Sequence, residues 1–262
     1  MATQVTLVSL YGDKQGDFAA LIAECQQLVA RAVGSAFTPY DVRQIHATII
    51  GLERHRAPAC NASFSKHRGE DVAMDFTGFL AYLRTCEHIP FEVQLGGFAP
   101  GDYPFTSRKA APYERSFSVQ GDKLVVMGWP VRSEPRSTPP AIPAATSHGA
   151  RTYPPTLELI RRTAQRYGIL HGYHRAAADV DNDLFFRIGL VDPEAIPASA
   201  TSALEFQARQ LLSARRPLVI GVQLEDIYIA AYEDARLPLS STRSWSLADP
   251  GVTGDFVAGL FV

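Results

Sequence analysis

Cysteine is scarce in this sequence. Its 262 residues include only Cys25, Cys60 and Cys86, an odd number with wide spacing and no Cys-x-x-Cys pair. That pattern indicates neither a disulfide framework nor a zinc site. His55 and His67 flank Cys60, but their spacing matches no zinc signature. We therefore expect a cytoplasmic protein, in a reducing compartment, that holds no metal and no other cofactor.

Long apolar runs and an excess of positive charge are also absent. No run approaches the roughly 18 apolar residues of a membrane helix, and the N-terminus lacks the basic and apolar segments of a signal peptide. Lys and Arg total 25 against 27 Asp and Glu, a net charge of -2, whereas proteins that bind long nucleic acids carry a basic excess. We expect no membrane and no long nucleic acid as partner, although a local basic pocket for one phosphate stays open. The sequence leaves the oligomeric state undetermined.

Several common enzyme motifs are missing as well. The sequence contains no Gly-x-Ser-x-Gly, no Gly-rich P-loop and no Gly-x-Gly-x-x-Gly after a strand, which argues against hydrolase-elbow and nucleotide-fold motifs. Hydrophobic residues make up 46% and charged residues 20% of the chain, ordinary values for a folded globular protein. The length fits one large domain or two small ones.

Apolar periodicity predicts a mixture of strands and helices. Residues 5–10 are typical of a strand, and residues 17–33 of an amphipathic helix that starts at Asp17 and stops at Gly34. The other predicted elements are helices at 75–86, 156–167 and 204–212, strands at 91–98 and 183–191, a hairpin at 116–119 and 123–131, and one or two strands within 218–232. This order indicates an α+β or α/β fold built from two related lobes.

Proline, serine, threonine and alanine crowd residues 130–155. Such a composition sustains neither a strand ladder nor a helix. Because the segment separates a strand from a helix within one pattern, we expect a surface loop over residues 132–155, inserted into a single bilobal domain that spans residues 1–262.

The apolar run Ile45-His46-Ala47-Thr48-Ile49 carries a polar pair. In a β-strand His46 and Thr48 project to one face, while the apolar residues beside them face the other way. Two polar residues on one face of an apolar strand predict a wet groove there. The alternative is an ordinary exposed sheet face.

His46-Ala47-Thr48-Ile49 matches a His-x-Thr-hydrophobic motif. With the order of strands and helices around this motif, the chain resembles the two-histidine (2H) phosphoesterase superfamily, which includes the 2'-5' RNA ligase-like and cyclic nucleotide phosphodiesterase proteins. The resemblance implies an α+β fold in which two pseudo-symmetric lobes of antiparallel sheet with flanking helices surround a central groove. It also implies that a 2',3'-cyclic phosphate or related phosphodiester is opened by one histidine as general base and another as general acid, while threonines bind the phosphate oxygens.

The second motif departs from the family pattern. At the matching position, in Phe185-Phe186-Arg187, Phe185 stands in place of the histidine and Arg187 in place of the threonine. Arginine offers a phosphate a bidentate donor, and Phe185 could stack on a nucleobase. The alternatives are a core position for Phe185 and a surface strand charge for Arg187.

Turnover without the second histidine requires another proton carrier. His171 and His174 lie upstream of the second motif position, and His174, Tyr173 or water are candidates for the role. The predicted site consists of the catalytic residues His46 and Thr48 and the substrate-binding residues Phe185, Arg187 and His174.

Three functions compete. The first is a divergent phosphoesterase that acts on a cyclic phosphate, a nucleotide or an RNA terminus, with His46 as general acid or base. The second is a catalytically impaired protein of the same fold that binds nucleotides or RNA ends, which the missing histidine favours. The third is an interaction protein that uses residues 130–155 or the tail at 237–262. The apolar end of that tail is expected to dock on its own domain.

Overall fold

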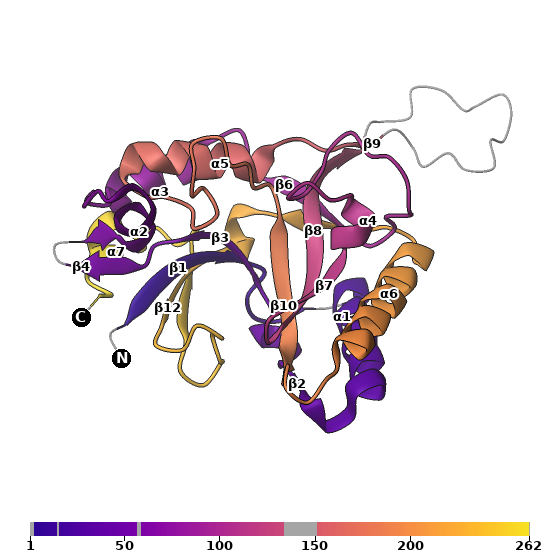
Figure 1. Cartoon of the computed structure of the whole chain (residues 1–262). Helices are drawn as coiled ribbons and strands as arrows, with labels where there is room; N and C mark the ends of the chain where they lie inside the picture. The colour runs from indigo at the N-terminus through magenta and orange to yellow at the C-terminus, as the bar shows by residue number, and fades with distance from the viewer. Residues whose placement is uncertain (1–2, 15, 57–58, 134–150, 262) are drawn as a thin grey trace, which may run out of the picture.

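The computed structural model describes the whole chain except residues 1–2, 15, 57–58, 134–150 and 262 (Figure 1). It confirms an α+β fold with a large antiparallel sheet, which includes 11 strands of the described chain. The main path of the sheet runs in the order β11 (Leu218–Val222), β6 (Phe91–Leu95), β8 (Lys123–Ser133), β10 (Leu184–Val191), β3 (Ala47–Gly51), β1 (Gln4–Ser9), β12 (Ile227–Tyr232) and β13 (Arg243–Ser246).

Short strands extend this path. β2 (Phe37–Pro39) pairs with β10, while β7 (Phe117–Gln120) and β9 (Arg151–Thr152) pair with β8. The β7–β8 pair is the predicted hairpin. β4 (Arg54–Arg56) and β5 (Cys60–Asn61) form a separate two-stranded sheet.

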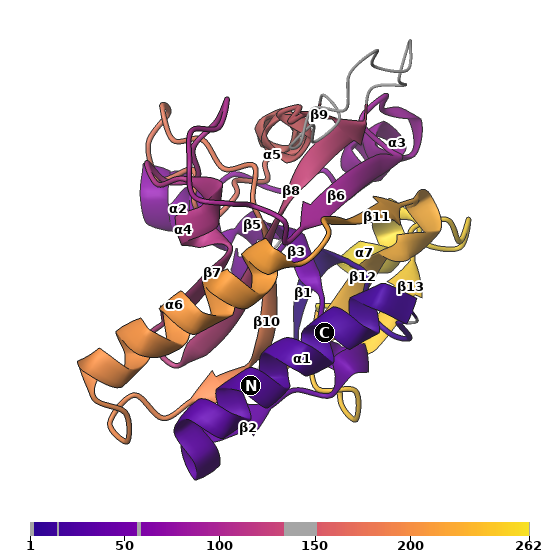
Figure 2. The same cartoon turned by 90° about the vertical axis from the view of Figure 1, so that its right-hand side faces the viewer.

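Two long helices lie side by side against the sheet (Figure 2). α1 (Gly16–Val33) confirms the predicted amphipathic helix, with Phe18, Leu21 and Ile22 among its buried residues. α6 (Ala198–Ala214) begins six residues earlier than the predicted start at 204. Residues 198–203 have the sequence Ala-Ser-Ala-Thr-Ser-Ala, without a large apolar side chain. The apolar periodicity that predicts a helix therefore starts only at Leu204 and misses the first turns.

The remaining α-helices are α2 (Ala62–Arg68), α3 (Phe76–Thr85), α4 (Pro112–Arg115), α5 (Thr156–Ala164) and α7 (Gly254–Ala258). The N-cap of α3 is Asp75, whose carboxylate accepts a hydrogen bond from the Gly78 amide at 2.8 Å. Phe261 in the C-terminal tail is 4% exposed and stacks on Phe76 of α3 at 5.8 Å. The tail therefore docks on its own domain, as expected. None of the described helices has the length and apolarity needed to cross a membrane.

The predicted loop at 132–155 is wrong at both ends. Arg132 and Ser133 belong to β8, and they pair with Thr152 and Arg151 of β9. Proline density misleads here because Pro130 itself lies inside β8, and a strand accepts proline where no ladder bond needs its nitrogen. Residues 134–150 of the predicted loop lie outside the described residues.

The two halves of the main path meet at a narrow seam. β3 and β10 are antiparallel neighbours that share one residue pair, Ala47 with Phe186. On either side of that pair the sheet is far more extensively hydrogen-bonded, as between β10 and β8 or β3 and β1. Symmetry between two lobes stays a prediction. The seam is the place where β3, which follows His46, meets β10, which carries Phe185 and Arg187.

Candidate functional site

The register at the seam brings four predicted site residues to one face. Continuing the antiparallel pairing outward from Ala47 and Phe186 sets Thr48 opposite Phe185 and His46 opposite Arg187. Ala47 and Phe186 are fully buried, whereas the other four side chains are half-buried. They therefore share the less buried face of the sheet, as the strand period predicts.

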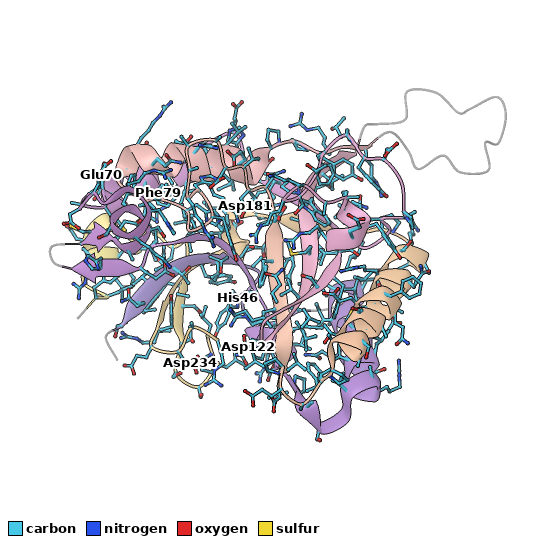
Figure 3. All side chains as sticks on the ribbon, viewed as in Figure 1. His46, Glu70, Phe79, Asp122, Asp181 and Asp234 are labelled. Atoms are coloured by element: carbon cyan, nitrogen blue, oxygen red, sulfur yellow. The ribbon has the colours of Figure 1, made fainter. Side chains whose placement is uncertain are left out.

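His46 immediately precedes β3, near the centre of the molecule (Figure 3). Its Nδ1 lies 2.7 Å from the carbonyl oxygen of Gln44. Because a carbonyl only accepts, Nδ1 carries the proton and Nε2 keeps its lone pair. Burial lowers the pKa of His46 to about 4 against the raising effect of the Gln44 bond, and the charges of Arg187 and Lys14 lower it further. His46 is therefore neutral at pH 7, ready to accept a proton.

A buried arginine holds the two strands beside this pair. Arg161 of α5 is 2% exposed and donates to the carbonyl oxygens of Ile49 at 2.8 Å and Thr48 at 3.2 Å. Across the seam it donates to the carbonyl oxygens of Asp181 at 2.9 Å and Asp183 at 3.1 Å, and to the Asp181 carboxylate at 3.2 Å. All five N–H groups are thus engaged. Arg161 satisfies backbone acceptors on both sides of the seam and fixes its width.

A cavity of about 280 Å³, called here the motif cavity, opens at the seam. Thr48, Phe185 and Arg187 line it together with Lys123 and His171. The structure therefore brings three of the predicted site residues into one cavity. His46 lies on the same strand face but is not among the residues that line this cavity.

The charges of the motif cavity favour an anionic ligand. Arg187 lies 3.4 Å from the Tyr40 hydroxyl, and within the described residues no carboxylate lies within 4.0 Å of its guanidinium. Among the described residues, the one carboxylate within 4.0 Å of the Lys123 ammonium is that of Asp122, which is exposed. Glu53 also lines the cavity, and burial raises its pKa, which lowers the negative charge that it contributes. Positive charge is thus left for a ligand.

His171 is the histidine that the structure brings to the motif cavity. It is 6% exposed, and its Nε2 lies 3.4 Å from the Asp181 carboxylate. Its Nδ1 is buried, and no described residue forms a hydrogen bond with it. Burial and the charge of Arg161 lower the pKa of His171 to about 3. Burial raises the pKa of Asp181, but Arg161 and His171 outweigh burial and hold that pKa well below its usual range. The pair is a carboxylate beside a neutral imidazole.

His174, predicted as a substrate-binding residue, lies elsewhere. It is fully buried, with Nε2 at 2.9 Å from the Glu158 carboxylate and Nδ1 at 3.4 Å from the Gln165 amide. It does not line the motif cavity. Its contacts hold residues 168–183 against α5, so its role in the structure is to support the segment that carries His171.

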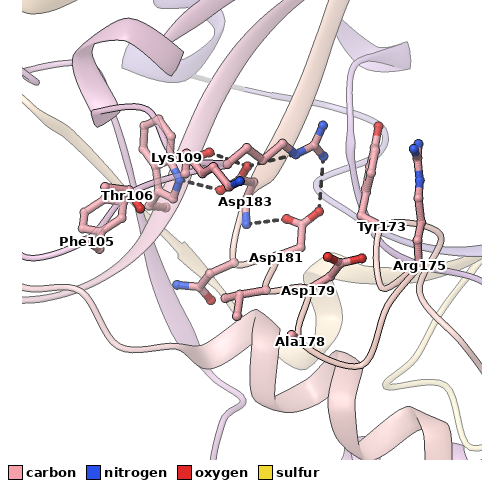
Figure 4. Close-up of a pocket in the computed structure, with 14 residues that line it drawn as sticks. Phe105, Thr106, Lys109, Tyr173, Arg175, Ala178, Asp179, Asp181 and Asp183 are labelled. Carbon is pink, nitrogen blue, oxygen red and sulfur yellow. Dashed lines mark hydrogen bonds and ion pairs between the residues drawn. The ribbon is translucent and has the colours of Figure 1, made fainter.

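A second cavity, of about 630 Å³, adjoins the first (Figure 4). We call it the Arg108 cavity, because Arg108 forms the shared wall together with Tyr173, Asp181 and Asp183. The Asp183 carboxylate accepts from the Ser107 hydroxyl at 2.6 Å and from the Trp129 indole at 2.7 Å. Two hydrogen bonds from residues of the Arg108 cavity therefore fix Asp183 in the wall.

Within the residues that the structure describes, no three His, Cys, Asp or Glu side chains are grouped to hold a metal ion. The sequence matches no protein-family model and no curated protein. Among solved structures, it is similar to a conserved protein of unknown function from Agrobacterium tumefaciens at 12% identity, with a TM-score of 0.42, over 94% of this chain and 86% of that chain. A likeness at this level carries no argument about function.

Proposed function

We propose that the chain is a divergent phosphoesterase that acts on a cyclic phosphate, a nucleotide or an RNA terminus. The observation that carries the proposal is that Thr48, Phe185 and Arg187 line one cavity beside the seam pair of Ala47 and Phe186. His46, which precedes Ala47, lies close enough for the charge of Arg187 to lower its pKa. A neutral histidine, a hydroxyl, a guanidinium and an aromatic ring are the groups needed to bind a phosphate ester beside its base and to move a proton.

The proposed reaction is hydrolysis of a 2',3'-cyclic phosphate. Nε2 of His46 takes a proton from water as the water oxygen bonds to phosphorus, and the bond from phosphorus to one ribose oxygen breaks. Arg187 and the Thr48 hydroxyl bind the non-bridging oxygens, where negative charge grows. The leaving oxygen needs a proton, and His171 is the group in the motif cavity that we assign to deliver it.

Both histidines are neutral in the free protein, so His171 must first gain a proton. A phosphate anion in the motif cavity favours that gain, because an opposite charge nearby raises a histidine pKa. Substrate binding and proton uptake are coupled in this scheme. Activity should therefore rise as the pH falls from 7 toward 5, for as long as the fold persists.

A second function is favoured by a specific observation, the phenylalanine at position 185. The protein would then be a catalytically impaired binder of nucleotides or RNA ends, with Phe185 as a stacking surface and Arg187 as the phosphate ligand. In this alternative the same residues bind the ligand, but the protein does not hydrolyse it.

The test is hydrolysis of 2',3'-cyclic nucleotides and 2'-5'-linked dinucleotides by wild type and His46→Asn. Asparagine keeps a donor for the Gln44 carbonyl but lacks Nε2, so we expect a loss of about 100-fold or more in kcat/KM. His55→Asn, at an exposed position of β4, is the matched control and should match wild type. Equal rates for wild type and His46→Asn would exclude the catalytic role, and binding without turnover by wild type would select the second function.

We also propose a cytoplasmic location. The support is that Cys25, Cys60 and Cys86 are all free thiols, as a reducing compartment would keep them. Mass analysis of the protein purified from its native cells tests this: three free thiols are expected.

A further inference from the structure

We infer that the Arg108 cavity is a second ligand subsite, which binds an aromatic ring carrying a phosphate. The inference rests on the proposed function for its choice of a phosphate ester, because the cavity shares the wall of Arg108 and Tyr173 with the motif cavity. Its volume of about 630 Å³ has room for a nucleotide.

A strained turn carries two cationic side chains to this cavity. Ser107 and Ala110 exchange both backbone hydrogen bonds, at 2.9 and 3.0 Å, which leaves Arg108 and Lys109 as the two central residues. Their φ angles are +49° and +69°, a left-handed conformation that turns of this kind usually assign to glycine or asparagine. Residues held in such conformations cluster at ligand sites. Both side chains line the cavity.

The cations of the cavity differ in what they contact. The Arg108 guanidinium lies 3.7 Å from the centre of the Tyr173 ring and 3.3 Å from the Asp181 carboxylate. Lys109 and Arg175 form no ion pair with any residue that the structure describes, and they stand on opposite sides of the cavity (Figure 4). These two side chains are therefore the cations of the cavity that are left for a phosphate.

Three carboxylates line the cavity beside these cations, those of Asp179, Asp181 and Asp183, and each is already engaged. The Asp179 carboxylate accepts from the Ala176 amide at 2.7 Å. Asp183 is occupied by the Ser107 hydroxyl and the Trp129 indole, and Asp181 by Arg161, His171 and Arg108. With their oxygens engaged, these carboxylates offer little to a metal ion or an amine. An anion is therefore the ligand that the remaining charges select.

The cavity also leaves apolar surface uncovered. Tyr173 is 39% exposed and Val180 is 65% exposed, two of the four large exposed hydrophobic side chains in the described chain, and both line the cavity. Phe105 lies on the opposite wall from Tyr173 (Figure 4). A flat ring between these walls would cover that surface and take it out of water.

The test is a titration with adenosine 5'-monophosphate, followed by the fluorescence of Trp129, which lines the cavity. A Trp245→Phe background removes the other tryptophan. We expect a saturable change, and Lys109→Asn and Arg175→Asn should each weaken the affinity about 3- to 10-fold. Lys109→Arg should restore it. Because asparagine accepts the left-handed φ, Lys109→Asn should lose affinity without losing thermal stability.

No saturable change, or a change whose affinity Lys109→Asn and Arg175→Asn leave intact, would overturn the second subsite. Arg187→Gln separates this result from the proposed function. It should weaken the binding of a 2',3'-cyclic nucleotide in the motif cavity, whereas Lys109→Asn and Arg175→Asn should weaken that of adenosine 5'-monophosphate in the Arg108 cavity. If Arg187→Gln affects neither ligand while the other two variants keep their effect, the proposed function fails and the subsite stands.

Discussion

Arg161 helps to set the charge of the buried pair beside it. Its guanidinium contacts the Asp181 carboxylate at 3.2 Å, and its charge lowers the pKa of both Asp181 and His171. The charge of Arg161 therefore helps to keep the carboxylate charged, while burial first and the charge of Arg161 second keep the imidazole neutral. Without Arg161, protonation of His171 would be favoured, because a protonated imidazole would balance the charge of the Asp181 carboxylate.

The free energy of unfolding should decrease as the pH decreases, because His171 is buried as a neutral imidazole. Its pKa is about 3 in the fold and about 6.5 in the unfolded chain. Between these two pKa values His171 binds a proton in the unfolded chain but not in the folded protein. Its contribution to the free energy of unfolding is therefore complete above about pH 6.5 and is lost as the pH falls below that value. The slope for one such histidine is about 1.4 kcal/mol per pH unit.

Urea unfolding at pH 7 and pH 5 measures this effect. His171→Gln, which keeps a donor for Asp181, should show a shallower loss of unfolding free energy than wild type. His55→Gln should show the same loss as wild type, because that side chain is exposed. Equal slopes for wild type and His171→Gln would contradict the assigned burial of a neutral imidazole.

Strand period is a local property, so the sequence predicted the shared face of His46 and Thr48 before any tertiary contact was known. The same period placed Phe185 and Arg187 together. His171 could be named as a candidate but not placed, since it lies in the irregular segment at 168–183. The turn residues Arg108 and Lys109 carried no signal, because a left-handed pair of basic residues contradicts ordinary turn chemistry.

At the scale of elements, the seam between β3 and β10 depends on α5. One residue pair joins the two strands, and the side chain of Arg161 donates both to Ile49 of β3 and to Asp183, the residue that precedes β10. A helix residue thus takes the place of ladder bonds, which leaves room beside the seam for the motif cavity.

Arg161→Lys should destabilise the fold by about 3 kcal/mol, because an ammonium cannot reach both strands and leaves buried carbonyl groups unsatisfied. Arg166→Lys, at an exposed position of the 3-10 turn that follows α5, is the control and should change stability by less than about 0.5 kcal/mol. The measurement is the urea midpoint at pH 7. Equal midpoints for the two variants would show that Arg161 does not hold the seam.

Elements with strong apolar periodicity were predicted well, as α1 and the β7–β8 hairpin show. The ends of elements were predicted poorly where composition misled. The start of α6 has only small side chains, and β8 runs through Pro130. The end of β8 depends on its pairing with β6 and β9, which no local pattern reveals.

At the scale of the whole molecule, one antiparallel sheet carries strands from both halves of the chain to a common seam. The N-terminal half supplies β3 with its His-x-Thr motif, and the C-terminal half supplies β10 with Phe185 and Arg187. That arrangement is what a two-lobed phosphate site requires, while pseudo-symmetry of the lobes stays a prediction. We propose that the seam binds a phosphate ester through Arg187.

Isothermal titration with adenosine 2',3'-cyclic phosphate tests that claim most directly. A His46→Asn background blocks turnover, and Arg187→Gln or the exposed control Arg166→Gln is added to it, so both double variants lose one positive charge. Loss of a charge-assisted bond to phosphate predicts an affinity at least about 10-fold weaker for Arg187→Gln, with Arg166→Gln unchanged. Equal affinity of the two double variants, or no binding by His46→Asn alone, would contradict the account.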